Sequence, residues 1–418
     1  MILRKLRERL LLKSATAQTP ESLKQLELRL QKPVTFYLGI DPTANFLHLG
    51  HFMQLMAAKW MMTHKHNCII VLGEFTALIG DPSGKTKERQ TLPISQVSDN
   101  TNKLESLIKT IDSNSSSLIS DDRAFHILRN NWNDMNLLDF FHLGKSFSLS
   151  TMLSRDCVKS RIEKGISYTE FSYMIFQAND FLHLYKKYNC TIQLGGSDQY
   201  GNILSGINII RNINSSDTVP IHGITLNLLT DKNHQKIGKS MISASKRGQA
   251  VISDNYNDAV YMYNYLLNIP DSNVVQMVLK LSHLPENSTK QQLADFVVDC
   301  CWKGFPSKFI RKLLNTLYYP ETVSNEEAEE LLKNKQVSSF IVEVTGTNTL
   351  STDLIADTFD IVRKVAKQAI QSGNSIKMFD LNSRKWSTLK ERKLVSESIP
   401  GFCVIQYGTN IPFLLKQK

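Results

Sequence analysis

Several features that define whole classes of protein are scarce or missing in this sequence. Its 418 residues contain only six cysteines, none spaced as Cys-x-x-Cys, so neither a disulfide framework nor a zinc clamp is indicated. No run approaches the roughly 18–20 consecutive apolar residues of a membrane-spanning helix, so we expect no membrane association. With 42% hydrophobic and 21% charged residues, the chain is too apolar for general disorder, and its length predicts two or three folded domains.

Acidic residues are also scarce relative to basic ones. The 49 Lys and Arg exceed the 39 Asp and Glu, which gives a net charge of +10. This excess favours a polyanionic partner such as nucleic acid, with a generally basic surface as the alternative. Residues 361–418 hold eleven Lys and Arg against three Asp and Glu, so a charge of +8 lies at one end of the chain.

The first 20 residues are basic and admit two interpretations. They contain five basic residues, with Leu, Ser and Thr between them, and one acid, Glu8. The basic residues are Arg4, Lys5, Arg7, Arg9 and Lys13. This composition resembles a short organellar transit segment, but an ordinary basic helix would have it too.

Strand and helix signals alternate in the first half. Residues 34–40 and 68–73 are short apolar, β-branched runs typical of strands buried on both faces of a sheet, and residues 49–63 between them have helical periodicity. A strand at 191–195 and a helix at 203–213 repeat the pattern. The sequence therefore predicts an α/β domain with a Rossmann-like parallel sheet, and a ligand crevice at the carboxyl ends of its strands.

The second half has a different character. After about residue 250 helical periodicity dominates, at 259–267, 274–281, 290–301 and 326–332. Residues 346–352 are rich in Gly, Thr, Asn and Ser, as a linker would be. We predict a Rossmann-like domain at 1–245, a helical domain at 246–345, and a small α+β RNA-binding module at 352–418.

The segment from Tyr37 to His51 leads from a predicted strand into a predicted helix. His48 and His51 lie three residues apart on the first turn, so they share one face, and Gly50 lets a flat group approach the backbone. Because a helix N-terminus favours anions, the segment suits a nucleotide with its phosphates. A metal site is less favoured, since no third ligand follows at the spacing of zinc proteases.

A turn-rich basic segment follows the second predicted strand, from Gly80 to Arg89. It resembles a phosphate-binding Walker A loop but has three residues between its glycines instead of four, which argues against a P-loop nucleotidase. Lys85 and Arg89 could still close over phosphates, and a surface loop without function is the alternative.

A predicted helix near residues 168–182 carries one polar stripe. Tyr173, Gln177 and Asp180 are spaced as i, i+4 and i+7, and the other faces are apolar. These buried polar groups need partners, which either a small polar ligand or an internal network would supply.

Two further segments complete the set. Asp198 lies in a glycine-rich turn at the end of a predicted strand, where it could accept hydrogen bonds from a ribose. Lys236 and Lys239 flank a glycine and precede Ser240, and beside the other segments they predict a flexible pair of cations for a triphosphate.

In this order and spacing, the five segments resemble the class I aminoacyl-tRNA synthetases, and among them the tyrosyl-tRNA synthetases of bacterial and mitochondrial type. His48-Leu-Gly-His51 is similar to the family's H-I-G-H motif and Lys236-Ile-Gly-Lys239-Ser240 to its K-M-S-K-S motif. The stretches GDPSGK, TEFSYM and GGSDQYGN point to the tyrosine branch, although Leu38, Asn179 and Tyr200 differ from the residues usual there.

The resemblance implies a role for each motif residue. The predicted tyrosine-binding residues are Tyr37, Asp41, Asp81, Tyr173, Gln177, Asp180 and Gln199, with Tyr37 and Asp180 at the phenol hydroxyl. The predicted catalytic residues are Thr43, His48, His51, Lys85, Arg89, Lys236 and Lys239, most of them at the departing pyrophosphate. The predicted ATP-binding residues are Gly39, His48, Gly50, His51, Asp198, Lys236, Lys239 and Ser240. Mg²⁺ would arrive with ATP, and no protein-bound metal is predicted.

The sequence thus predicts a tyrosine–tRNA ligase that activates L-tyrosine with ATP and charges tRNA(Tyr). The resemblance also implies a homodimer, and the basic composition favours the mitochondrial matrix over the cytoplasm. Two alternatives stay open. One is a structured-RNA-binding or splicing cofactor built on a synthetase fold, and the other is a free-standing nucleotidyltransferase.

Overall fold

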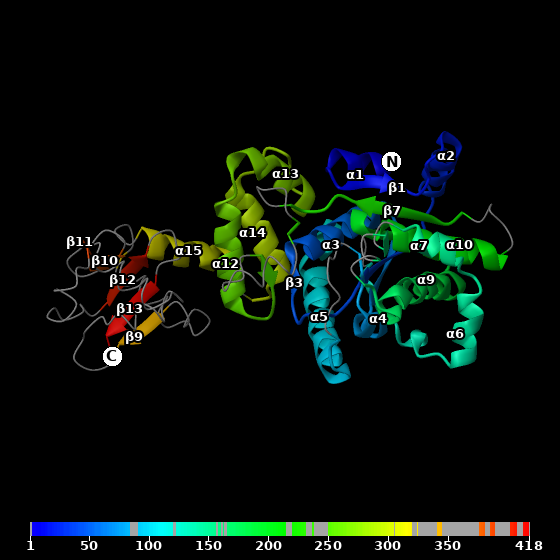
Figure 1. Ribbon diagram of the computed structural model, residues 1–418. Coiled ribbons are helices and arrows are strands. Elements are labelled where there is room, and N and C mark those ends of the chain that lie inside the picture. Colours follow the sequence, from blue (N-terminus) through cyan, green and yellow to red (C-terminus); the bar gives the residue numbers. More distant parts are fainter. Residues whose placement is uncertain are drawn as a thin grey trace. The chain divides into compact units, whose positions relative to one another are not determined.

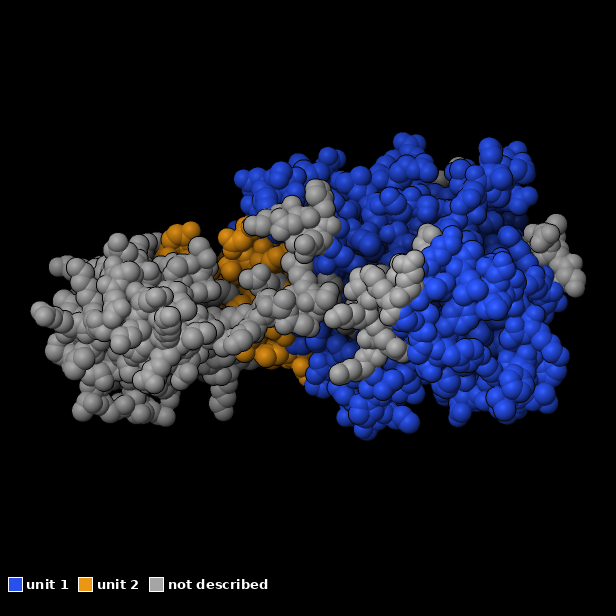
Figure 2. Space-filling model, viewed as in Figure 1, with its two compact units in different colours: residues 1–241, 251–253, 269–293 blue, residues 242–250, 254–268, 294–418 orange. Residues whose placement is uncertain are grey.

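The computed structural model describes most of the first 319 residues and five short strands after them (Figure 1). The described residues are 2–83, 91–119, 123–155, 158–159, 162, 165–214, 220–230, 236–237, 250–304, 306–319, 324, 341–344, 376–380, 385–388, 402–407 and 413–417. The chain divides into two compact units, coloured blue and orange in Figure 2. Unit 1 comprises residues 1–241, 251–253 and 269–293, and unit 2 comprises residues 242–250, 254–268 and 294–418.

Unit 1 is built on a six-stranded sheet with the order β1-β7-β6-β2-β4-β5. Its strands are β1 (Leu12–Ala15), β2 (Thr35–Ile40), β4 (Asn67–Leu72), β5 (His126–Arg129), β6 (Cys190–Gly196) and β7 (His222–Leu226). The strands from β7 to β5 all pair in parallel, and β1 adds antiparallel to β7 at one edge. The predicted Rossmann-like parallel sheet is therefore confirmed, and the antiparallel edge strand makes it a mixed sheet.

The helices of unit 1 connect and cover these strands. They are α1 (Ile2–Glu8), α2 (Pro20–Arg29), α3 (Leu49–Met62), α4 (Glu74–Ile79), α5 (Ile94–Asn114), α6 (Leu137–Gly144), α7 (Leu149–Leu153), α9 (Tyr168–Tyr188), α10 (Tyr200–Asn214) and α13 (Asp271–Leu281). Short 3-10 turns are η1 (Ser116–Leu118), η2 (Asn131–Asn133) and η3 (Ser197–Gln199), and β3 (Leu47–His48) pairs with β8 (Val251–Ile252). Within the described residues, no helix is both long and apolar enough to cross a membrane.

The hydrophobic core explains why the predicted strands read as continuous apolar runs. All seven residues of β6 are buried, as expected for a central parallel strand covered on both faces. Tyr37 of β2, Phe181 of α9 and Ile203 of α10 belong to one buried cluster. This packing fixes α9 against the sheet, so the polar stripe of α9 has a defined place beside the ends of β2 and β6.

The basic N-terminal stretch forms an integral part of unit 1. Ile2, Leu3 and Leu6 of α1 are buried. The guanidinium of Arg9 donates hydrogen bonds to four main-chain carbonyls at the end of α13, those of residues 278, 279, 282 and 284. A positive side chain at a helix C-terminus satisfies carbonyls that lack a helical partner. Residues 2–8 of this stretch form the helix α1 and residues 12–15 the strand β1, and the two interpretations of its basic composition both stay open.

Unit 2 contains a helical part and a second sheet. The helices are α12 (Tyr256–Leu267), α14 (Lys290–Cys301), which begins in unit 1, and α15 (Ser307–Tyr318). Asp295 joins them, since it accepts hydrogen bonds from Tyr263 at 2.8 Å and from Arg311 at 2.6 Å. The helices predicted at 259–267, 274–281 and 290–301 are confirmed, whereas the one at 326–332 lies outside the described residues.

The C-terminal strands form a five-stranded sheet with the order β11-β10-β12-β13-β9. They are β9 (Ile341–Val344), β10 (Ile376–Asp380), β11 (Lys385–Thr388), β12 (Phe402–Tyr407) and β13 (Phe413–Gln417). The pairs are antiparallel except for β13 with β9. The division into domains at 1–245, 246–345 and 352–418 stays a prediction.

Candidate active site

A cavity of about 290 Å³ opens in unit 1 at the carboxyl ends of β2 and β6. Fourteen of the residues predicted from the sequence line it: Tyr37, Gly39, Asp41, Thr43, His48, Gly50, His51, Asp81, Tyr173, Gln177, Asp180, Asp198, Gln199 and Lys236. The other four, Lys85, Arg89, Lys239 and Ser240, lie outside the described residues. Segments separated by up to 200 residues in sequence therefore meet in one site, where ligands of open parallel sheets bind.

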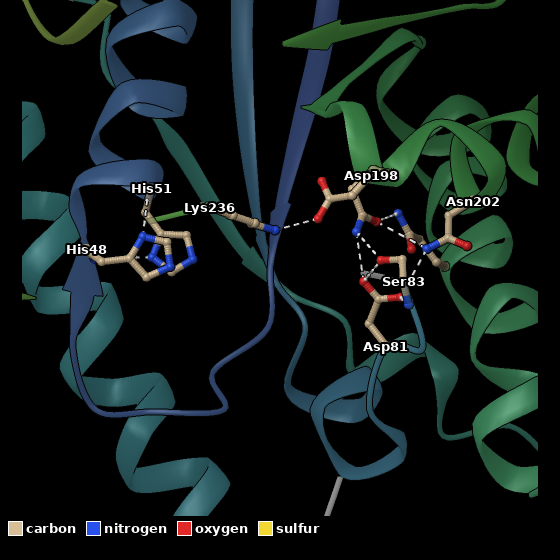
Figure 3. A network of polar contacts seen from close by, with 9 residues as sticks. His48, His51, Asp81, Ser83, Asp198, Asn202 and Lys236 are labelled. Carbon is tan, nitrogen blue, oxygen red and sulfur yellow. Dashed lines mark hydrogen bonds and ion pairs between the residues drawn. The ribbon is translucent and has the colours of Figure 1, made fainter. Parts of the chain in front are cut away.

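The two histidines cap the helix that follows β3. His48 is the N-cap residue of α3, its Nδ1 accepts from the backbone N–H of His51 at 3.3 Å, and the reciprocal bond has the same length. Their rings stack with centroids 3.7 Å apart (Figure 3). The pair thus satisfies N–H groups that a helix N-terminus would leave without partners, and both histidines line the cavity.

At one end of the cavity lie Tyr37 and Asp180. Both side chains are buried, and the Tyr37 hydroxyl has no hydrogen-bond partner among the described residues. The Asp180 carboxylate accepts from the indole of Trp132 at 2.9 Å and the amides of Asn133 and Asn130 at 2.7 and 3.2 Å. Burial raises the pKa of Asp180 to about 7, and these three donors oppose the rise. A hydroxyl and a carboxylate are therefore available to a polar group that enters here.

A second set of hydrogen-bonded polar side chains lies beside them, supplied by α9, by α4 and by the residue that follows β2. The Tyr173 hydroxyl donates to one oxygen of Asp41 at 2.8 Å, and the Thr76 hydroxyl donates to the other at 2.8 Å. Burial, followed by the nearby Asp41 carboxylate, raises the pKa of Tyr173 well above its usual value. Gly73 makes room for this arrangement, since a Cβ there would lie 2.1 Å from Asp41 and 2.3 Å from Thr76.

Asp81 organises the neighbouring wall, shown in Figure 3. Its carboxylate accepts from the backbone N–H and hydroxyl of Ser83, from Gln199 at 2.7 Å and from Asn202 at 3.3 Å. The Gln199 oxygen in turn accepts from Gln177 at 3.3 Å. The polar stripe predicted on α9 thus continues into a network, and a network of carboxylates and amide oxygens is suited to hold an ammonium group.

The opposite end of the cavity is more open. Lys236 reaches across to Asp198 and forms an ion pair of 2.6 Å, with half of the lysine side chain exposed (Figure 3). Gly50 allows the chain at Ile237 to come close, because a Cβ on Gly50 would lie 3.3 Å from the Ile237 carbonyl. The histidine turn and the lysine segment are therefore adjacent, as a site for nucleotide and phosphates requires.

Several residues that complete the site are absent from the sequence prediction, among them Thr76, which donates to Asp41. Ser83 and Asn202 belong to the GDPSGK and GGSDQYGN segments, so their motifs could have indicated them. Asn130, Trp132 and Asn133 follow β5 in a stretch without periodicity or a motif. Across the described part of the chain, no group of three or more His, Cys, Asp or Glu side chains is placed to hold a metal ion.

Comparison with known proteins assigns the family. The sequence model of the tRNA synthetases class I (W and Y) matches residues 29–344. The chain belongs to this family. The resemblance to class I synthetases expected from its five motifs is therefore confirmed, and the α/β fold of unit 1 is the fold of this synthetase family.

Individual relatives of this class I synthetase point to one branch. A tyrosine–tRNA ligase of Clostridium kluyveri is 38% identical over 269 residues, which are 63% of either chain, so the match spans less than two thirds of that relative. C-terminally truncated mitochondrial tyrosyl-tRNA synthetases of Coccidioides posadasii and Aspergillus nidulans have TM-scores of 0.62 at 26% identity. These two matches cover 74% and 76% of this chain and 91% and 94% of those chains.

Proposed function

We propose that this class I synthetase is a tyrosine–tRNA ligase. The observation that carries the proposal is the buried pair of Tyr37 and Asp180 in the cavity, one with a hydroxyl that has no partner among the described residues and the other with a carboxylate. The phenol hydroxyl of the substrate can donate to the Asp180 carboxylate and accept from the Tyr37 hydroxyl. Phenylalanine would leave the Tyr37 hydroxyl without a partner and would offer no donor to Asp180. Buried polar groups without partners are costly, so the pair selects tyrosine.

The remaining tyrosine contacts follow from the polar walls. The amino group of the substrate would lie among Asp41, Asp81, Tyr173 and Gln177, which supply carboxylate, hydroxyl and amide oxygens. Gln199 would face its carboxyl region. This arrangement would direct the substrate carboxylate toward the part of the cavity lined by the histidines and Lys236.

The first chemical step is adenylate formation. An oxygen of the tyrosine carboxylate attacks the α-phosphorus of ATP, a new O–P bond forms, and the bond to the β,γ-pyrophosphate breaks. The carboxylate is already a nucleophile, so the site supplies position and positive charge and needs no general base. Thr43, His48, Lys85, Arg89, Lys236 and Lys239 would stabilise the departing pyrophosphate, and His51, Gly39, Gly50, Asp198 and Ser240 would hold the nucleotide. Mg²⁺ would arrive with ATP as part of that substrate.

The second step transfers tyrosine to the terminal ribose of tRNA(Tyr). A hydroxyl of that ribose attacks the carbonyl carbon of the adenylate, and AMP leaves. The basic segment 361–418, with a charge of +8, supports the proposal that residues 352–418 bind RNA. The mitochondrial synthetases among the similar solved structures support a mitochondrial location.

A homodimer is supported by an apolar surface on unit 1. Leu137, Leu138 and Phe141 of α6 and Leu149 of α7 are all more than half exposed. Leu137 and Phe141 lie one helical turn apart on α6, and exposed apolar side chains grouped in this way mark interaction surfaces that a second copy of the chain would cover. Sedimentation equilibrium on the purified protein tests this, since a monomer at micromolar concentration contradicts it.

Tyrosine-dependent exchange of pyrophosphate into ATP is the decisive experiment for the ligase. We expect exchange with L-tyrosine and far less with phenylalanine, followed by tyrosine-dependent charging of tRNA(Tyr). A purified, folded protein that shows no exchange with tyrosine, or equal exchange with phenylalanine, contradicts the proposed function.

A further inference from the structure

One side chain outside the cavity is connected to the group that would bind the phenol. Asp180 receives its shortest hydrogen bond, 2.7 Å, from Nδ2 of Asn133, a fully buried residue of η2. The oxygen of the same amide accepts from Nδ2 of Asn179 at 2.7 Å. Asn179 precedes Asp180 on α9, but it does not line the cavity. Two hydrogen bonds therefore run in one direction, from Asn179 through Asn133 to Asp180.

This direction has a chemical consequence. An asparagine amide presents a donor on one side and an acceptor on the other, and only the donor side can bind a carboxylate. The amide of Asn179 occupies the oxygen of Asn133, so the NH₂ of Asn133 is left facing Asp180. Without Asn179, the Asn133 oxygen loses this donor, and the amide is less firmly held in the orientation that serves Asp180.

The hydrogen bonds of Asn133 with Asn179 and Asp180 also join two elements that are far apart in the sequence, η2 and α9. Asn133 lies in η2, directly after β5, while Asn179 and Asp180 lie in α9. Trp132 of η2 also donates to Asp180, and its ring stacks on His183 of α9 with centroids 4.2 Å apart. The Asn133–Asn179 bond thus fixes the turn that supplies two of the three donors to Asp180.

We propose that Asn179 is a positioning residue for amino-acid selection, which acts through Asn133 on Asp180 and thereby sets the preference for tyrosine over phenylalanine. This inference rests on the proposed tyrosine–tRNA ligase activity. Asn179 touches no substrate atom in this scheme, so its effect must pass through Asn133. That requirement distinguishes it from a residue that only stabilises α9.

A double-mutant cycle tests the coupling. We expect Asn133→Ala to lower the ratio of kcat/KM for tyrosine over phenylalanine roughly 10- to 100-fold, since it removes a hydrogen bond to a charged group. Asn179→Ala should lower the ratio about 3- to 10-fold through the tyrosine KM, with kcat and the KM for ATP unchanged. The double variant should match Asn133→Ala alone, because residues that act as one unit are not additive.

A matched control separates this role from general stability. Like Asn179→Ala, the variant Asn212→Ala on α10 removes one asparagine amide that donates a hydrogen bond. The acceptor here is the backbone carbonyl of Ser146, at 3.3 Å, and Asn212 does not line the cavity. We expect it to leave the selectivity ratio unchanged. Asn179→Asp keeps the shape of the side chain but cannot donate in its ionised form, so it should lower the ratio at least as far as Asn179→Ala. This second variant remains informative if Asn133→Ala fails to fold.

The outcomes are distinct. Fully additive effects in the cycle, or a selectivity ratio in Asn179→Asp equal to that of the unaltered protein, would overturn the positioning role while the ligase activity stands. If the unaltered protein shows no tyrosine-dependent exchange, both the proposed function and this inference are overturned. Selectivity lost in Asn179→Asp and not in Asn212→Ala, at unchanged KM for ATP, supports the inference.

Discussion

The two ends of the cavity are built on different principles. At the phenol end, Asp180 is 4% exposed and receives three hydrogen bonds from η2 and the residue before it, while Tyr37 is 1% exposed. At the nucleotide end, Lys236 has a half-exposed side chain and an ion pair with Asp198. At the phenol end the Tyr37 hydroxyl has no partner among the described residues and can bond a ligand, whereas at the nucleotide end Lys236 and Asp198 pair with each other.

The buried side chains at the phenol end and the exposed side chain at the nucleotide end suit different tasks. The buried Tyr37 hydroxyl beside a buried carboxylate discriminates strongly, because a ligand that cannot hydrogen-bond to them leaves a desolvated hydroxyl without a partner. An exposed lysine paired with Asp198 discriminates little, but it can exchange one anionic partner for another at small cost. Substrate selection and charge stabilisation are therefore separable, and substitutions at the two ends should affect different kinetic parameters.

The largest effect is expected from Asp180→Ala. The change removes the acceptor for the phenol hydroxyl, so the preference for tyrosine over phenylalanine in pyrophosphate exchange should fall by on the order of 10³ or more, with little change in the KM for ATP. Tyrosyl-tRNA synthetases are themselves the known example of this discrimination, which reaches about 10⁵. Asp139→Ala, which removes an exposed acid on α6, is the control. An unchanged preference would refute the role of Asp180.

The elements that carry the motif residues of this site could be predicted from the sequence, whereas the hydrogen-bond donors around Asp180 could not. Strand β2, the turn at His48 and the polar stripe of α9 follow from local periodicity and motif spacing, and the structure brings all of them to one cavity. The donors Trp132 and Asn133 could not be found in the same way. Their contact with Asp180 depends on the pairing of β5 with β4, which no local pattern specifies.

Lys236→Ala tests the open end. Removal of this cation should lower kcat for exchange roughly 100-fold, as the loss of one group that stabilises transition-state charge does elsewhere, while the KM for tyrosine changes little. The control is Lys109→Ala on α5, an exposed lysine whose ion pair with Glu105 has the same length, 2.6 Å. A tyrosine KM that rises together with the loss of kcat would show that the two ends are not separable.

Gly73→Ala should disturb the wall between the two ends. The added methyl would lie 2.1 Å from Asp41 Oδ1, so the carboxylate or the start of α4 must move. We expect the KM for tyrosine to rise about tenfold, with a loss of about 1–3 kcal/mol in the free energy of unfolding, as for other overpacked sites. Gly144→Ala is the matched control, since a Cβ there meets no atom within 4 Å. Equal behaviour of the two variants would contradict the steric argument.

The last prediction concerns the pH dependence of stability at the phenol end, which changes no kinetic preference. Burial raises the pKa of Asp180 to about 7, above its ordinary value of about 4, so the folded state binds more protons than the unfolded state between these two pH values. This carboxyl therefore lowers the free energy of unfolding as the pH rises from about 4 to 7, with a slope of about 1 kcal/mol per pH unit.

Asp180→Asn removes the titrating group and should remove this slope. In urea titrations between pH 5 and pH 8, the difference in free energy of unfolding between the variant and the unaltered protein should shift in favour of the variant as the pH rises. Any cost of placing an amide beside the three donors is independent of pH, so the slope isolates the charge. Asp139→Asn, which replaces an exposed carboxyl, should show no such shift. A pH-independent difference for Asp180→Asn would mean that the donors of η2 already hold Asp180 ionised throughout, and that the phenol end keeps a full negative charge before tyrosine binds.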